Sequence, residues 1–123
     1  MGMNFLLDTN AIIYLINGRL ALALPDGRYG VSVITEIELL SFPDLRLDEE
    51  QRIRAFLAVC DRVAIDEPIR DQAIALRRRH RLKIPDAIIA ATAMVADAEL
   101  FSNDGKLAGI PDLRLRAVPI EPG

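Results

Sequence analysis

Short hydrophobic runs alternate along the chain with longer segments in which hydrophobic residues recur at helical spacing. The short runs predict strands over residues 4–7, 29–33, 62–65, 99–102 and 114–118. The longer segments predict helices over residues 9–17, 34–42, 48–61, 68–82 and 85–97, and a short apolar helix within residues 19–28. Strands that alternate with helices indicate an α/β fold, with a parallel sheet covered by helices on both faces.

Four acidic residues follow the predicted strands or open the predicted helices. Asp8 directly follows the first strand, and Glu38 lies in the helix after the second. Asp86 follows Pro85 at the start of a helix, and Asp104 follows the strand over residues 99–102. Because open parallel sheets bind ligands beyond the carboxyl ends of their strands, we expect these four side chains to gather at one edge.

Carboxylates gathered in this way repel one another by roughly 4 kcal/mol per close pair at an effective dielectric constant of about 20. Either protons or a divalent cation must neutralise such a cluster, and at neutral pH we expect the cation. Oxygen ligands favour Mg²⁺ or Mn²⁺ over zinc, and the single histidine, His80, lies within an arginine cluster and is a poor zinc ligand. An oxygen-bound divalent ion activates water and stabilises phosphoryl charge, so this chemistry predicts phosphodiester hydrolysis.

Each acid also has a purely structural interpretation. Asp8 can cap the following helix, and Thr35 and Glu38 have the spacing of a capping box. Asp86 can complement a helix dipole, and residues 103–105 can form a simple turn. These interpretations require four independent coincidences, whereas one metal site explains all four positions.

Composition narrows the class of protein further. The net charge of −3 argues against a protein that coats nucleic acid by bulk electrostatics. The only cysteine, Cys60, excludes an internal disulfide and suggests a reducing compartment. The apolar stretch over residues 5–16 is interrupted by polar residues and is too short to span a bilayer, and no secretion signal is recognisable. We therefore expect one soluble, cytoplasmic domain over residues 1–123 that does not bind membranes.

Four sequence blocks carry a family resemblance: Leu-Leu-Asp-Thr-Asn at 6–10, Ile-Thr-Glu-Ile-Glu-Leu at 34–39, Pro-Asp-Ala-Ile-Ile-Ala-Ala-Thr-Ala at 85–93 and Phe-Ser-Asn-Asp at 101–104. They resemble the signature blocks of the PIN domain, and more narrowly of the VapC-like toxin ribonucleases of toxin–antitoxin pairs. The resemblance covers essentially the whole chain. It implies a three-layer α/β/α sandwich with a central parallel sheet, and a Mg²⁺- or Mn²⁺-dependent endoribonuclease. It also implies a homodimer that a cognate antitoxin neutralises.

The resemblance assigns roles to individual residues. The family's metal-binding acids are matched by Asp8, Glu38 and Asp86, and less strictly by Asp104. Glu36 is excluded because the family's acid immediately precedes the position of Leu39, and two residues along a helix point roughly 200° apart. Small polar residues that hold ligands or water beside the acids are expected at Thr9, Asn10 and Ser102.

Two features of the sequence stay open. Residues 77–83 carry five of the 15 basic residues and form either a solvated helix end or a patch that contacts phosphates. Hydrophobic residues concentrated over residues 12–24 form either core or a surface for a dimer partner or antitoxin.

Three other functions compete with the toxin interpretation. A receiver-type signalling domain needs an acidic pair after the first strand, where this chain has only Asp8, and typically Lys-Pro where Leu107 follows Lys106. A PIN fold that only binds is disfavoured because all four acids are present. PIN nucleases that process DNA flaps or ribosomal RNA usually carry insertions or extra domains that a chain of 123 residues lacks.

Overall fold

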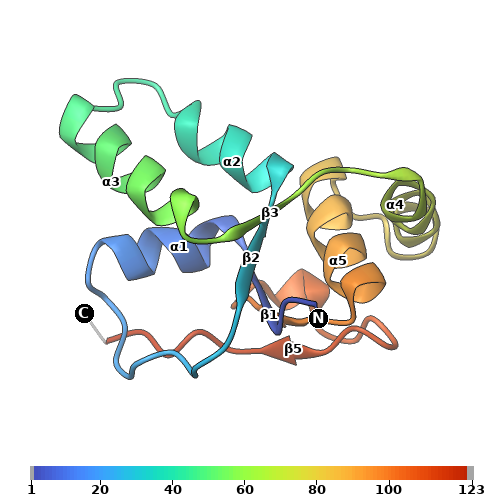
Figure 1. Ribbon diagram of the computed structural model, residues 1–123. Coiled ribbons are helices and arrows are strands. Elements are labelled where there is room, and N and C mark those ends of the chain that lie inside the picture. Colours follow the sequence, from blue (N-terminus) through green and yellow to red (C-terminus); the bar gives the residue numbers. More distant parts are fainter. Residues whose placement is uncertain (1, 122–123) are drawn as a thin grey trace.

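The computed structural model describes residues 2–121, which form a parallel five-stranded sheet with the strand order β3-β2-β1-β4-β5 (Figure 1). The strands are β1 (Phe5–Leu7), β2 (Tyr29–Ser32), β3 (Asp61–Val63), β4 (Glu99–Phe101) and β5 (Leu115–Arg116). The α-helices are α1 (Thr9–Ile16), α2 (Val33–Leu40), α3 (Leu47–Ala58), α4 (Glu67–His80) and α5 (Ile84–Ala96). A short 3₁₀ helix, η1 (Gly105–Leu107), follows β4.

The helices form two layers, one on each face of the sheet (Figure 1). Leu6 and Leu100 face α4 and α5 in one buried cluster, whereas Leu7, Val31 and Phe101 face α1, α2 and α3 in the other. Neighbouring residues of a strand point to opposite faces, so the apolar strands supply both cores. The predicted three-layer α/β/α sandwich is confirmed.

Helix α5 lies against the sheet along most of its length. All residues from Ala87 to Ala93 are buried. The small alanine side chains permit close approach of the helix to the sheet, and a helix buried on all sides has little freedom to shift. This packing fixes the backbone of Asp86, which lies in the first turn of α5.

The short helix predicted within residues 19–28 is wrong. Helix α1 ends at Ile16, Gly18 has a φ of 68°, and the chain then runs without helical structure to β2. Leu20 forms an antiparallel bridge with Ile120, and the Ala21 N–H donates to the Pro119 carbonyl at 2.7 Å. Pairing with the distant C-terminal segment therefore replaces the local helix.

Over residues 2–121, no helix is both long enough and apolar enough to cross a bilayer.

Candidate functional site

A pocket of about 370 Å³ lies beyond the carboxyl ends of β1 and β4. The structure brings all four predicted acids to its wall, together with two of the predicted polar residues. The lining comprises Asp8, Thr9, Asn10, Glu38, Phe42, Asp86, Ile89 and Asp104. Residues from both helical layers and from the loop after β4 meet here, as expected for the ligand-binding edge of an open parallel sheet.

Asp8 is the most buried of the four acids, with 8% of its surface exposed. It caps α1, because its Oδ1 accepts a hydrogen bond from the Ala11 N–H at 2.8 Å. Burial raises the pKa of its carboxyl, and hydrogen bonds from Ser102 and the Ala11 N–H lower it, while the charges of Asp104 and Asp86 raise it further. Asp8 is thus both a helix cap and part of the acidic pocket.

Glu38 is held by Thr9 across two helices. The Thr9 hydroxyl donates to Glu38 Oε1 at 2.6 Å, and the Thr9 and Thr35 hydroxyl oxygens are 3.3 Å apart. The capping box considered for Thr35 and Glu38 is wrong, because α2 begins at Val33 with Ser32 as its cap. Thr35 therefore lies inside the first turns of α2, fully buried, rather than at the cap position.

Glu36 lies on another side of α2 and does not border the pocket. Its Oε2 is 3.5 Å from a guanidinium nitrogen of Arg62 on β3. The structure thus separates the two glutamates of α2 as helix geometry requires, with Glu38 toward the pocket and Glu36 away from it.

Asp86 lies between acidic and basic neighbours. Burial raises the pKa of its carboxyl, as do the charges of Asp104 and Glu38, whereas Lys106 and Lys83 oppose the shift. The raised pKa means that this carboxyl binds a proton more readily than a carboxyl in water, as expected for acids brought together in a partly buried pocket.

Asp104 and Ser102 link the loop after β4 to Asp8. Asp104 Oδ1 accepts from the Lys106 N–H at 2.9 Å, and the Asp104 N–H donates to Ser102 Oγ at 3.1 Å. Ser102 is buried at 3% exposure, and its hydroxyl lowers the pKa of the Asp8 carboxyl. Ser102 therefore holds the backbone of Asp104 and influences Asp8, although it does not line the pocket itself.

The chemistry of the donor set fits a hard divalent cation, because four carboxylates border one pocket and the charges of their neighbours help to raise the pKa of the Asp8 and Asp86 carboxyls. Within residues 2–121, however, no three His, Cys, Asp or Glu side chains converge closely enough to hold one ion. The four carboxylates border the pocket, and coordination of a single ion would require at least three of them to move closer together.

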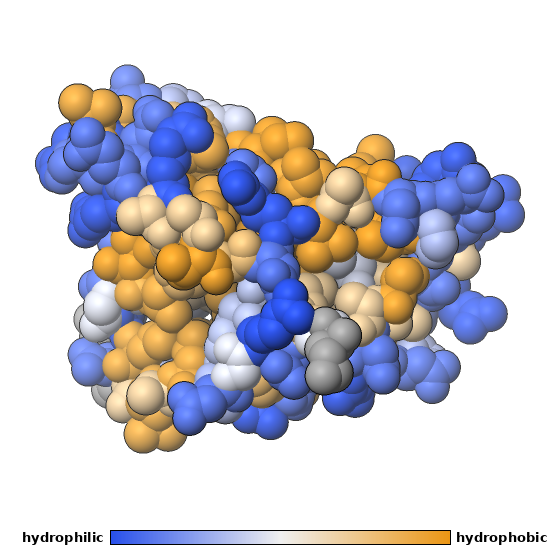
Figure 2. Space-filling model, viewed as in Figure 1, coloured by the Kyte–Doolittle hydropathy of each residue, from blue (hydrophilic) through white to orange (hydrophobic). Residues whose placement is uncertain are grey.

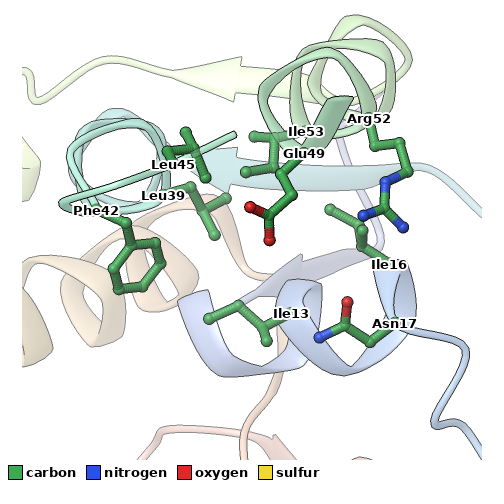
Figure 3. Close-up of a pocket in the computed structure, with 9 residues that line it drawn as sticks. All are labelled: Ile13, Ile16, Asn17, Leu39, Phe42, Leu45, Glu49, Arg52 and Ile53. Atoms are coloured by element: carbon green, nitrogen blue, oxygen red, sulfur yellow. The ribbon is translucent and has the colours of Figure 1, made fainter. Parts of the chain in front are cut away.

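A second, apolar pocket of about 230 Å³ lies between α1, α2 and α3 (Figure 3). We call it the apolar groove; it is lined by Ile13, Ile16, Asn17, Leu39, Phe42, Leu45, Glu49, Arg52 and Ile53. Phe42 borders both this groove and the acidic pocket, so the two are adjacent. The sequence indicated Ile13 and Ile16 but not the contributions of α2 and α3.

The hydrophobic residues over 12–24 thus divide into different environments. Ile12 is core, Ile13 and Ile16 line the apolar groove, and Leu22 is 69% exposed. The core interpretation is therefore right for Ile12, whereas a partner surface at Ile13 and Ile16 stays a prediction.

Comparisons with known proteins agree with this structure. Residues 5–113 match the PIN domain family. A chain of a toxin–antitoxin complex from Klebsiella pneumoniae is 34% identical with a TM-score of 0.74, and the match covers 89% of this chain and 95% of that one. A chain of VapBC-1 from nontypeable Haemophilus influenzae is 28% identical with a TM-score of 0.69, covering 94% and 98%. A chain of VapBC2 from Rickettsia felis, solved bound to a promoter DNA fragment, is 20% identical with a TM-score of 0.76, covering 94% and 98%. A search of curated proteins gave no match.

The fold and the acidic pocket define a PIN-type α/β domain, and the chain belongs to the PIN domain family. Its VapC-like character, predicted from the four sequence blocks, is confirmed as well. This assignment excludes the receiver-type signalling domain.

Proposed function

We propose that the protein is a metal-dependent endoribonuclease and the toxin of a toxin–antitoxin pair. The observation that carries this proposal is the acidic pocket, where Asp8, Glu38, Asp86 and Asp104 meet at the ligand-binding edge of a PIN fold. Asp8, Glu38 and Asp86, supported by Asp104, would hold Mg²⁺ or Mn²⁺. Bound there, such an ion would lower the pKa of water and neutralise charge on a phosphoryl oxygen.

The chain's own residues orient this site. Asp8 is anchored by its helix cap, and Glu38 is anchored by the Thr9 hydroxyl. The buried helix α5 holds the backbone of Asp86. Hydrogen bonds that orient ligand carboxylates typically change metal affinity or activity by roughly 10–100-fold when they are removed.

The test is cleavage of single-stranded and looped RNA by purified protein with Mg²⁺ or Mn²⁺, and loss of cleavage in EDTA. Asp8→Asn should remove nearly all activity, because it deletes a charged ligand yet keeps an oxygen that can cap α1. Asp86→Asn should do the same, and Asp104→Asn should have a milder effect. Glu36→Gln is the matched control on α2 and should leave cleavage unchanged.

Undiminished cleavage by Asp8→Asn would overturn the assigned site. Single-stranded DNA and DNA flaps of equal length serve as competing substrates, and faster cleavage of either would favour a PIN nuclease that acts outside a toxin system.

We further propose that a cognate antitoxin occupies the apolar groove and reaches into the acidic pocket. Ile13 and Ile16 offer a partly exposed hydrophobic surface, and Phe42, which is 46% exposed, joins that surface to the carboxylates. A guanidinium has a fixed charge and a planar donor fork, so an arginine of the antitoxin can pair with the pocket carboxylates and compete with the metal ion.

Ile13→Lys or Ile16→Lys should weaken antitoxin binding at least tenfold, because each places a charge in an apolar contact. RNA cleavage should persist, provided that the circular dichroism melt shows a folded protein. Val59→Lys is the matched control, since Val59 is 82% exposed and lies outside the apolar groove. Unchanged antitoxin affinity in folded Ile13→Lys protein would refute this docking site.

The homodimer implied by the family resemblance stays a prediction, which sedimentation equilibrium of the purified protein tests directly.

A further inference from the structure

The chain has only two lysines among its 15 basic residues, and each lies within three residues of an acid that lines the acidic pocket. Lys83 occupies the N-cap position of α5 without a side-chain cap bond, three residues before Asp86. Lys106 lies in η1, two residues after Asp104, and donates its backbone N–H to that carboxylate at 2.9 Å. Both side chains are exposed, and the charges of both act on the Asp86 carboxyl.

Most cations elsewhere on the molecule are neutralised locally. Ion pairs with Asp or Glu side chains engage Arg28, Arg46, Arg54, Arg62, Arg70, Arg114 and Arg116. Over residues 2–121, neither lysine side chain forms an ion pair of this kind within 4 Å, and the exposed Arg78 and Arg81 form none either. Arg77 has a structural contact instead, because its Nε donates to the Leu82 carbonyl at 3.0 Å and links the last turn of α4 to the segment that follows it.

Uncompensated positive charge therefore concentrates at the turn between α4 and α5 and at η1, on the Asp86 side of the acidic pocket. Figure 2 shows the hydrophilic surface over the outer side of α4, at the right of the view. The apolar groove lies on the other side of the pocket, between α1, α2 and α3, and meets the pocket at Phe42. The two approaches to the pocket thus differ in chemistry: one is mainly apolar, although Glu49 and Arg52 also line it, and the other is cationic.

A polyanion that enters a pocket walled by four carboxylates is repelled unless cations lie nearby. A metal ion held by the carboxylates would compensate one phosphate, but the phosphates on either side of it would remain exposed to the carboxylates. An ammonium is a compact charge with three donors and suits a phosphate oxygen that needs no fixed geometry. The position of the lysines matches this need.

We propose that Lys83 and Lys106 are positioning residues that bind the phosphates flanking the scissile bond of the RNA strand. The strand then lies over the α4–α5 turn and η1, away from the apolar groove. This inference rests on the proposed nuclease function and adds to it the path of the substrate. Contacts with phosphates carry no sequence information, so the two lysines serve every RNA sequence alike.

The experiment measures kcat and KM for cleavage of short single-stranded RNA by Lys83→Gln, Lys106→Gln and the double variant. We expect KM to rise several-fold in each single variant while kcat stays within about twofold. Lys83→Arg and Lys106→Arg should restore KM, because the positive charge is kept. Arg54→Gln is the charge-matched control on α3, where Arg54 pairs only with Glu50 in the helix, and its KM should stay unchanged.

Salt dependence gives a second readout that a structural role would not change. A phosphate contact on a single strand contributes a slope of about −0.7 to the logarithm of affinity against the logarithm of salt concentration. Between about 50 and 200 mM salt, the KM ratio of variant to wild type should therefore shrink about 2.6-fold for each lysine removed. The effect should be equal for RNAs of unrelated sequence.

Unchanged KM and salt slope in the double variant, with wild-type protein that cleaves RNA, would overturn this inference and leave the nuclease proposal intact. A changed requirement for Mg²⁺ at unchanged KM would also overturn it, because the lysines would then act on the carboxylates rather than on RNA. Wild-type protein that neither binds nor cleaves RNA would refute both proposals. Lys→Met variants retain the aliphatic side chain and replace any glutamine variant whose melt shows loss of folding.

Discussion

Replacement of Thr9 by valine tests whether the wall of the acidic pocket is organised by hydrogen bonds between helices. The Thr9 hydroxyl of α1 donates to Glu38 Oε1 of α2 at 2.6 Å, a short distance that is typical of a donor paired with an ionised acceptor. Valine keeps the branched shape of threonine but removes the hydroxyl, and with it both the donor to Glu38 and the contact with the Thr35 hydroxyl. Glu38 then loses the group that holds its carboxylate at the pocket.

The expected loss follows from the strength of this contact. Hydrogen bonds to charged groups contribute about 1.5–3 kcal/mol, and the lower figure applies here because the pair is only partly buried. About 1.4 kcal/mol corresponds to a tenfold change in an equilibrium constant. If Glu38 is a metal ligand, Thr9→Val should therefore raise the half-saturating Mg²⁺ concentration about tenfold.

The assay is the initial rate of RNA cleavage over a Mg²⁺ titration, with metal affinity measured independently by calorimetry with Mn²⁺. The rate of Thr9→Val at saturating metal should stay within about twofold of wild type, because the other carboxylates are intact. Thr9→Ser restores the hydroxyl and should restore the metal requirement. An unchanged half-saturation point in Thr9→Val would refute the role of Thr9, and a large loss of rate that excess metal cannot recover would place Thr9 on the substrate instead.

Three further outcomes follow from burial and charge. Asp86→Asn should raise the melting temperature of metal-free protein and reduce the increase in melting temperature caused by Mg²⁺. At a free metal concentration ten times the dissociation constant, metal binding stabilises the wild type by about 1.4 kcal/mol, or about 5 °C for a chain of this length. The pKa values of Asp8 and Asp86 are raised above 3.8, so the stability that their protonation contributes is complete below pH 3.8 and is lost as pH rises through the folded values. In urea denaturation without metal, the unfolding free energy of wild type should therefore fall relative to that of Asp86→Asn over this rise in pH. A difference between the two proteins that stays constant with pH would contradict the shifts. Leu39→Ala should lower the unfolding free energy by about 2–5 kcal/mol, because Leu39 is fully buried beneath the apolar groove. A chemical denaturation midpoint equal to that of wild type would show that Leu39 is not part of the core.

The arrangement of strands and helices could be predicted from the sequence because it depends on local patterns. The pairs Leu6–Leu7 and Leu100–Phe101 are apolar at consecutive positions, as strands covered on both faces require, and the structure divides each pair between the two cores. The positions of Asp8 and Asp86 next to β1 and at the start of α5 follow from the same patterns. The helix predicted around Leu20 from local propensity is wrong, because Leu20 pairs with Ile120, which lies 100 residues away and leaves no signal in the local sequence.

The composition of the site was predictable only in part, for a similar reason. The four acids could be found from their order along the chain and from the family resemblance. The contacts that hold them could not, since the Thr9–Glu38 bond joins residues 29 positions apart and Phe42 connects two pockets only once α1, α2 and α3 have packed together. The sequence therefore identified the chemical groups, and the tertiary structure supplied their orientation.

The structural and functional interpretations of the acids are compatible, because a carboxylate has more acceptor sites than a cap uses. Asp8 caps α1 and Asp104 caps η1, in each case through Oδ1, and Thr9 binds Glu38 through Oε1. Two carboxylate oxygens offer about four lone-pair sites, so each group keeps capacity for a cation after its structural bond is made. These bonds hold the acids in place despite their mutual repulsion. Replacement of Asp by Asn should therefore preserve the cap while it removes the charge, and replacement by Ala should remove both. A fold equally stable with Asn and Ala at position 8, measured by urea denaturation without metal, would show that the cap contributes nothing and that the position of Asp8 serves the acidic pocket alone.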